Sequence, residues 1–381
     1  MSKFKSIAAV TLSLLGLTLG ASSVSATPNY VSHVDAGLGS IGSYFGHINW
    51  SIDGAAEPDH VANQPQTIRF EKPEGATVRA AWLISGDGGN RNNSGHPPTD
   101  VKLNGVSVSY SDWSKITTNP GGDAWNNFNT YWGDVTDIVA STINTASAGI
   151  HTMSFDQGDG TDNDTVEGGS LVVIFDDPNA PMSSIYLNAG TADPAGSTFT
   201  FNFPALTQVN LDSDMLLSVG ISNSYQANYW EQSSNIKANN QWLSSVAGGC
   251  DDSSTFATTG CNYGGYNTIG GIGDTPSVPG QIDTELVSYD RNLDRELYRL
   301  NSLMQLGDRQ LTVNTTNPSN NDNIYFAGIY LKNILPTANY CDTHDCGNGT
   351  LASTGNGSSS QLWLSLGLIL LGLGIKVARR I

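Results

Sequence analysis

Short runs of β-branched and aromatic residues recur along the middle of the chain, separated by clusters of glycine, asparagine, aspartate and serine. This alternation is typical of strands in β-sandwiches and barrels. Residues 80–84 and 171–175 are continuously apolar, which predicts central strands buried on both faces. The predicted strands are residues 67–70, 78–85, 100–108, 150–156, 170–175, 198–203, 215–222, 235–243, 309–315 and 323–332.

Helical patterns are few. Residues 132–142 and 293–304 each offer one or two amphipathic turns. Asn104-Gly105 lies between two short β-rich runs and predicts a tight hairpin turn. The order of strand, Asn-Gly hairpin, short helix and glycine-led strand resembles jelly-roll domains of the galactose-binding type.

The two groups of predicted strands follow the same order along the chain, which suggests an internal duplication. The pairs of parallel segments begin at Val78 and Met215, Asp100 and Asn235, Trp132 and Leu297, Ala148 and Leu306, and Gly168 and Asn323. We therefore expect an all-β fold of two tandem jelly-roll-like β-sandwich domains, residues 27–195 and 196–338. Each sandwich would enclose its own core between two sheets.

Both ends of the chain carry export signals. Residues 1–26 combine a basic start, an apolar stretch and the small-residue sequence Val-Ser-Ala, which predicts a signal peptide cleaved by signal peptidase after Ala26. At the other end, residues 339–361 form a linker, and residues 362–381 form an apolar helix with a basic tail. An apolar run of that length is a marginal membrane span.

The linker contains Leu-Ala-Ser-Thr-Gly at residues 351–355, which resembles the Leu-Pro-x-Thr-Gly sorting signal of sortase substrates with alanine in place of proline. The resemblance implies a sortase-like processing enzyme that cuts between Thr354 and Gly355. A plain tail anchor is the alternative. Either way the protein is expected outside the cytoplasm, at the cell surface or anchored to the membrane through its C-terminal helix.

The four cysteines fit that compartment, where disulfides form. The simplest pairing is two local disulfides, one between Cys250 and Cys261 and one between Cys341 and Cys346. Charged residues make up only 14% of the chain, and 35 acidic residues face 17 basic ones. Such an acidic surface repels phosphate backbones, so nucleic acid is excluded as a partner.

An acidic, glycine-rich segment follows the predicted strand at residues 150–156. Calcium takes six to eight oxygen ligands, and glycines let a loop fold around it. Carboxylates this close also repel one another unless a cation screens them. The segment predicts a calcium site, with a solvated acidic loop as the alternative. Its carboxylates are Asp156, Asp159, Asp162, Asp164 and Glu167.

Two further segments combine aromatic side chains with amides, as sugar-binding sites do. The candidate ligand-binding residues are Trp113, Trp125, Tyr131, Tyr229 and Trp230. The alternative is that these aromatic side chains pack into the sandwich. Lys102 and Lys237 fall at equivalent places in the two halves, which raises an isopeptide cross-link of the kind found in surface fibres.

Nothing in the sequence marks a catalytic centre. No Gly-x-Ser-x-Gly elbow occurs, and no two of the six histidines are spaced as a metal pair. We expect no enzymatic activity, although an exported hydrolase with two carboxylates among the many acidic residues stays an alternative.

Several motifs resemble bacterial and archaeal secreted surface proteins that carry an adhesin-like domain of unknown function. The likeness rests on Gly168-Gly-Ser-Leu-Val-Val-Ile-Phe-Asp-Asp-Pro178, Asp134-Val-Thr-Asp-Ile-Val139 and Asp322-Asn-Ile-Tyr-Phe-Ala-Gly328. It implies a non-enzymatic, surface-displayed adhesin-like or structural protein of the cell envelope, with surface glycans or other envelope proteins as partners. The alternative is a secreted carbohydrate-binding module that uses the aromatic segments.

Overall fold

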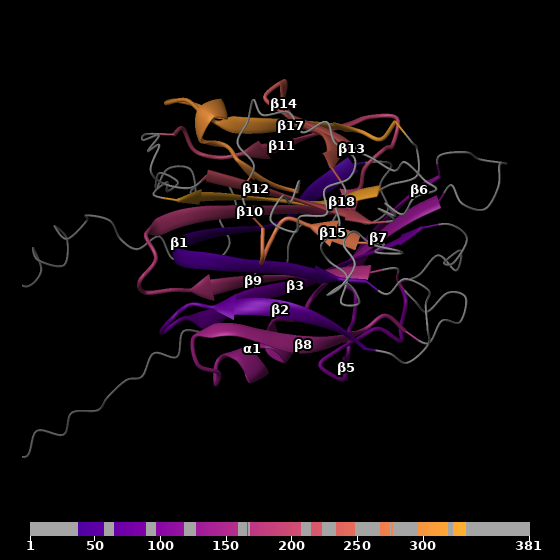
Figure 1. The fold of residues 1–381 in the computed structure, drawn as a ribbon, viewed down its shortest axis with the longest axis vertical. Coiled ribbons are helices and arrows are strands. Elements are labelled where there is room, and N and C mark those ends of the chain that lie inside the picture. Colours follow the sequence, from indigo (N-terminus) through magenta and orange to yellow (C-terminus); the bar gives the residue numbers. More distant parts are fainter. Residues whose placement is uncertain are drawn as a thin grey trace, which may run out of the picture.

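The structure is a computed structural model and describes residues 37–56, 65–88, 97–117, 127–158, 166, 168–206, 215–222, 234–247, 267–274, 276, 296–318 and 323–332. Strands dominate these residues, and they form three sheets (Figure 1). The prediction of an all-β protein is confirmed.

The largest sheet has ten strands, and the two smaller sheets have four strands each. The order in the large sheet is β15 (Asn267–Ile269), β12 (Met215–Ser222), β18 (Asn323–Lys332), β10 (Met182–Thr191), β1 (Gly37–Ala55), β9 (Gly168–Asp176), β3 (Thr77–Gly88), β7 (Asn127–Asp134) and β6 (Asp112–Thr117), and β16 (Leu297–Arg299) also pairs with β12. The first small sheet is β2 (Gln66–Lys72), β8 (Gly149–Asp156), β4 (Lys102–Leu103) and β5 (Val106–Ser107). The second is β11 (Ser197–Asn202), β17 (Gln310–Thr316), β13 (Ser234–Ala238) and β14 (Gln241–Ala247).

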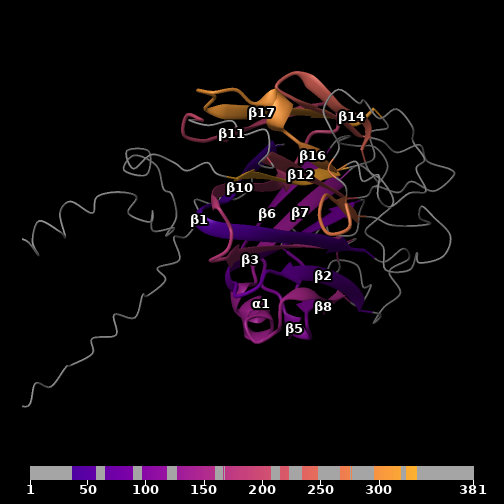
Figure 2. The same cartoon turned by 60° about the vertical axis from the view of Figure 1, so that its left-hand side comes forward.

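The large sheet folds back on itself at β1. Residues Gly37 to His47 of this strand pair with β10, and residues Ile48 to Ala55 pair with β9. The result is two inner layers that face each other, each covered on its outer face by one small sheet. Figures 1 and 2 show the four layers stacked in the order β11–β17–β13–β14, β12–β18–β10, β1–β9–β3 and β2–β8.

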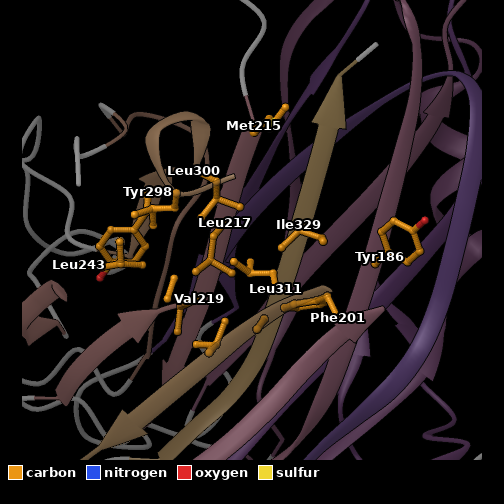
Figure 3. Close-up of a cluster of buried hydrophobic side chains, with 14 of the residues drawn as sticks. Tyr186, Phe201, Met215, Leu217, Val219, Leu243, Tyr298, Leu300, Leu311 and Ile329 are labelled. Carbon is orange, nitrogen blue, oxygen red and sulfur yellow. The ribbon is translucent and has the colours of Figure 1, made fainter. Parts of the chain in front are cut away.

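Among the residues that the structure describes, three hydrophobic cores hold the layers together. One core lies between the second small sheet and its inner layer, where Phe201 and Leu311 pack near Leu217 and Ile329 (Figure 3). A second core, which includes Phe155 and the buried face of the helix α1 (Thr136–Ile143), lies between the first small sheet and the other inner layer. The third core joins the two inner layers and contains Trp82, Trp132, Ile174, Leu187 and Phe326.

The two halves of the chain build these layers in the same order. In the first half β9 lies between β1 and β3, and β8 lies between β2 and β4; in the second half β18 lies between β10 and β12, and β17 lies between β11 and β13. The register agrees as well, since Trp82 pairs with Val172 in β3–β9, and Val219 pairs with Ala327 in β12–β18. These are the positions that the sequence comparison aligned.

Strands cross the boundary that was expected at residue 195. β10 precedes that boundary but pairs with β18 of the second half, and β1 contributes to both inner layers. The division into domains at residues 27–195 and 196–338 stays a prediction, and the described halves are joined through these strands and the third core.

Eight of the ten predicted strands each lie on one strand of the structure, whereas the segments 100–108 and 235–243 are hairpins, β4–β5 and β13–β14. The predicted helices are shorter in the structure. Trp132 belongs to β7, and the helix begins only at Thr136, whose backbone N donates to Asp134 Oδ1. In the segment 293–304, the described residues form the short strand β16 and a single 3-10 turn at Asn301–Leu303. Both segments begin as strands because their aromatic and aliphatic side chains are buried from two sides.

The predicted hairpin at Asn104-Gly105 is confirmed. Both residues have positive φ, 51° and 76°, and β4 pairs with β5 across them. Asn239 and Asn240 form the equivalent turn between β13 and β14, with φ of 45° and 63°. Two consecutive positive φ values are the signature of the hairpin turn whose twist matches that of the strands.

Candidate functional site

Asp156 is the one residue of the predicted calcium site whose surroundings are described. Its carboxylate lies 3.7 Å from Lys102 Nζ, and the carboxylate of Asp100 lies 3.3 Å from the same nitrogen. Hydrogen bonding and charge from Asp100 raise the pKa of Lys102, and Asp156 adds to this effect. The loop that follows closes at its base, where Val166 N donates to Gln157 O and Gln157 Nε2 donates to Val166 O.

The other four predicted calcium ligands, Asp159, Asp162, Asp164 and Glu167, lie outside the described residues. Among the residues that are described, no group of three or more histidine, cysteine, aspartate or glutamate side chains is placed to hold a metal ion. Calcium binding stays a prediction.

The aromatic candidates divide between core and surface. Tyr131 is 1% exposed and belongs to the core under the first small sheet, so its ring offers no face to a sugar. Trp113 is half-buried and stacks on Tyr131, with ring centroids 6.5 Å apart. The packing alternative therefore holds for Tyr131. Trp125, Tyr229 and Trp230 lie outside the described residues.

A polar pair lies beside these rings, and sequence reasoning did not single it out. Asp87 of β3 and Asn129 of β7 are directly opposite in the register, and both are fully buried at 0% exposure. Asn129 Nδ2 lies 3.5 Å from Asp87 Oδ2, which is a long hydrogen bond. Burying a carboxylate in a sheet is costly unless a partner or a proton compensates its charge.

An aromatic contact lies close to this pair along the strand, since Tyr131 is two residues from Asn129 on β7. Tyr110 packs on Tyr131 with ring centroids 5.7 Å apart, and its hydroxyl hydrogen-bonds Ser85 Oγ at 2.7 Å. Burial strongly raises the pKa of Tyr110, although the bond with Ser85 lowers it in part. Burial therefore disfavours the charged form of the Tyr110 hydroxyl.

A second buried carboxylate connects the two halves of the chain. Asp53 of β1 is 1% exposed, and Arg69 of β2 places Nη2 2.7 Å from its Oδ1. Burial raises the pKa of Asp53 to about 6, because desolvation outweighs the opposing effect of Arg69. Arg69 Nη2 also donates to Ile272 O at 2.9 Å, and Ile272 N donates to Ile52 O. The segment 269–274 thus fastens the second half onto β1 and β2.

The inner layers also meet through a polar contact. Tyr325 OH hydrogen-bonds both Ser170 Oγ and Asn267 Oδ1, and all three side chains are buried. Ser170 belongs to β9, Asn267 to β15 and Tyr325 to β18. Hydrogen bonding satisfies these groups within the protein, so the contact fixes how the two inner layers face each other.

Outside the described residues lie the cysteines and processing positions Cys250, Cys261, Cys341, Cys346, Ala26, Thr354 and Gly355. The predicted apolar helix at residues 362–381 also lies outside them. Within the described ranges, no helix is long and apolar enough to cross a membrane.

Asp53, Asp87 and Asn129 carry a weak signal in the sequence. Asp53 and Asp87 are single acidic residues set between glycine and small or apolar residues within strands, where an unpaired charge would not be tolerated. Such an isolated acid predicts a buried partner, but only the strand register identifies it.

Comparison with known proteins gives one family. No curated protein matches the chain. Among solved structures the chain is similar to the major capsid protein P2 from Bacteriophage PM2, at 8% sequence identity and a TM-score of 0.18, over 75% of this chain and 97% of that chain. At that score the likeness carries no argument about fold or function. A family model described as "Protein of unknown function (DUF3344)" matches residues 33–272, and the chain therefore belongs to this family.

Proposed function

We propose that this protein is a non-enzymatic, surface-displayed adhesin-like or structural component of the cell envelope. The observation that carries the proposal is the joining of the two halves through β1 and the third core. A stack of four layers with three buried cores makes a stiff unit, which is what an exposed structural protein needs. The predicted export signals and the acidic composition agree with this role.

We further propose that the stack arose by internal duplication of one jelly-roll-like β-sandwich. The shared strand order and the matching register of β3–β9 and β12–β18 support this origin. In this proposal β10 is the second copy of β1, since β1 lies next to β9 and β10 lies next to β18, the strand equivalent to β9.

Export and anchoring follow from the ends of the chain. Signal peptidase would release the protein after Ala26, and a sortase-like enzyme would cut between Thr354 and Gly355. Surface glycans or other envelope proteins are the proposed partners, with calcium as the proposed ion of the acidic segment.

The mass of the mature protein recovered from cell envelopes tests this proposal, because it reports both cleavages. Thr354→Ala should leave the protein in the membrane with its apolar tail attached. Unchanged processing of this variant would overturn the sorting signal. Release of the protein by Ile369→Arg alone, with no cleavage at Thr354, would support the plain tail anchor instead. Recovery of the wild-type protein in the cytoplasm would overturn the surface role.

A carbohydrate-binding module remains the second candidate, because Trp113 is only half-buried. Glycan-array binding that is lost in Trp113→Ala, Trp125→Ala or Trp230→Ala, with an unchanged melting temperature, would support it. Tyr131→Phe serves as the control, since Tyr131 is buried and its ring is retained in this variant. Full binding by all three tryptophan variants would remove this candidate.

A further inference from the structure

One face of the second small sheet carries almost no charge. This sheet is an outer layer of the stack, so one of its faces is turned to solvent (Figure 1). Its strands β11, β17, β13 and β14 contain a single charged residue, Lys237, and no carboxylate. The chain as a whole has a formal net charge of -18. The sheet therefore differs in charge from the rest of the chain.

The outward side chains of this sheet are ordered amides and hydroxyls. On β11 and β17 the exposed and half-buried positions hold only serine, threonine, asparagine and glutamine. Asn314 of β17 lies opposite Thr198 of β11, and Asn314 Nδ2 donates to Thr198 Oγ1 at 2.8 Å. Asn235 of β13 lies opposite Thr316 of β17, and Asn235 Nδ2 donates to Thr316 Oγ1 at 3.2 Å. An amide and a hydroxyl keep further donor and acceptor capacity after one such bond, so the face offers both kinds of group to solvent.

Lys237 and Trp242 extend the row that Thr198 and Asn314 begin. Lys237 lies opposite Asn314 on one side and opposite Trp242 on the other. Residues directly opposite one another on adjacent strands share one face of a sheet, so the four side chains lie side by side. Lys237 Nζ lies 4.2 Å from the centroid of the Trp242 ring, and both side chains are half-buried. This contact holds an aromatic ring at one end of the row of polar groups.

The equivalent face of the first small sheet is charged. Asp156 of β8 lies opposite Lys102 of β4, in the place that Asn314 takes opposite Lys237 in the second sheet. Glu71 of β2 is exposed on the same sheet. The two sheets share their strand order, so the fold itself does not require an uncharged face. The absence of charge is a property of the side chains of the second sheet.

The chemistry of this face selects its partner. Contacts between proteins centre on clustered aromatic and other large side chains, and Trp242 is the one aromatic residue described at the outward positions. An anionic polymer would meet one lysine and the repulsive field of an acidic chain. The hydroxyls of a neutral polysaccharide both donate and accept hydrogen bonds, as amide and hydroxyl side chains do. Its C–H surfaces can pack on an aromatic ring, and a sheet gives an extended polymer a continuous surface.

We propose that the outward face of the second small sheet binds a neutral polysaccharide chain. The amides of Asn235 and Asn314 and the hydroxyls of Thr198 and Thr316 hydrogen-bond the sugar hydroxyls, and Trp242 contacts a sugar ring. This inference rests on the proposed surface role, which brings the protein together with envelope glycans. It places the glycan on the second small sheet and not on the aromatic segments that the sequence suggested.

Retention of the mature protein by polysaccharides tests the proposal. Cellulose, chitin and dextran serve as neutral probes, and alginate serves as the anionic probe. The protein should bind at least one neutral probe, measured by co-sedimentation with cellulose or chitin and by retardation in native gels that contain dextran. The binding should change little with salt, because ionic contacts contribute little to it. Alginate should not retain the protein.

Two variants and a matched control locate the binding face. Asn314→Asp gives the second sheet the carboxylate that the first sheet has at Asp156, and it should weaken binding about tenfold because the donors of the amide are lost. Thr316→Val keeps a branched side chain but removes the hydroxyl, and it should weaken binding roughly threefold. Thr152→Asp adds a carboxylate to an exposed position on β8 of the first small sheet and should leave binding unchanged. If Asn314→Asp fails to fold, Thr316→Val keeps the proposal testable.

Four results would overturn the proposal. The first is binding to none of the neutral probes. The second is binding that Asn314→Asp and Thr316→Val leave unchanged in folded protein. The third is binding to alginate alone that falls with salt, which would identify an ionic contact. The fourth is a dimer in light scattering that forms without polysaccharide binding and is lost in Asn314→Asp, which would identify a second copy as the partner. In each case, recovery of the mature protein from cell envelopes would leave the surface role standing.

Discussion

Lys102 and Lys237 occupy the same register position in the two small sheets. Lys102 of β4 pairs with Asp156 of β8, and Lys237 of β13 pairs with Asn314 of β17. The backbone pairing of the lysine is thus the same in the two halves, whereas the residue opposite it is a carboxylate in the first half and an amide in the second. The structural position is conserved between the halves, and its chemistry is not.

That difference gives a first prediction. Lys237 lies 4.2 Å from the centroid of Trp242, and such cation–π contacts contribute about 0.5–1 kcal/mol at exposed sites. A double-mutant cycle with Lys237→Ala and Trp242→Ala, measured by urea unfolding, should give a coupling energy of that size that changes little with salt. Lys102→Ala should have a small effect that disappears at high salt, because its partners are carboxylates in solvent. Additive effects of the two substitutions at 237 and 242 would contradict the contact.

Asp53 predicts a dependence of stability on pH. Its pKa is about 6 in the folded protein against 3.8 for an ordinary aspartate, so the folded state binds the proton more tightly. The contribution of Asp53 is then fully present below pH 3.8 and is lost as the pH rises through about 6. The shift corresponds to roughly 3 kcal/mol at most.

The measurement is the difference in unfolding free energy between the wild type and Asp53→Asn from pH 3.5 to pH 7.5, about the window that the shift defines. This difference should change with pH, in the direction that favours the wild type at low pH. Asp137→Asn, which removes an exposed carboxylate in the helix, is the control and should show a much smaller change. A pH-independent difference for Asp53→Asn would show that Arg69 compensates the charge fully.

At Gly271 the second half of the chain lies so close to β1 that there is no room for even a methyl side chain. A Cβ atom at Gly271 would collide with the carbonyl oxygen of Ile52, whereas a Cβ atom at Gly39 would meet nothing within 4 Å. Gly271→Ala should therefore lower the unfolding free energy by about 1–3 kcal/mol. Gly39→Ala should leave the melting temperature nearly unchanged. Equal melting temperatures for the two variants would place the segment 269–274 away from β1.

The calcium prediction is tested by thermal melting. If the folded protein binds calcium through the acidic segment, free calcium at 100 times Kd raises stability by roughly 2.7 kcal/mol. The melting temperature should rise with calcium and fall with a chelator, and magnesium should substitute poorly because it requires tighter octahedral geometry. Replacing Asp162 and Asp164 by asparagine should remove the difference. An unchanged curve in millimolar calcium would leave the segment as a solvated loop.

The sequence predicted the strands that carry continuous or alternating apolar residues but missed the two that join the halves. β1 reads Gly-Leu-Gly-Ser-Ile-Gly-Ser over its first residues, and β10 contains Ser183, Ser184 and Asn188. Glycine, serine and asparagine normally indicate turns. Ser183, Ser184 and Asn188 are nevertheless buried in the stack, and a Cβ atom at Gly190 of β10 would collide with the carbonyl oxygen of Gly37. Close packing at these positions therefore favours small side chains over β-branched ones.

The pair of Asp87 and Asn129 escaped prediction for a different reason. The two residues lie far apart along the chain, and no local spacing relates them. Only the register of β3 and β7 brings them together. The Asn104-Gly105 turn was predictable because both residues of that signal are neighbours in the sequence.

The arrangement of β1 and β18 on either side of β10 determines how the protein would resist a pulling force. Both strands pair with β10, and Gly37 of β1 lies opposite Thr191 at one end of β10, whereas Lys332 of β18 lies opposite Ser183 at the other end. A pulling force applied at Gly37 and Lys332 would act along the strands in opposite directions. Because the hydrogen bonds between antiparallel strands run across them, this force would shear both ladders at once instead of opening them one bond at a time. The stack is therefore arranged to resist tension applied between Gly37 and Lys332, which is the load that the proposed surface role would place on it.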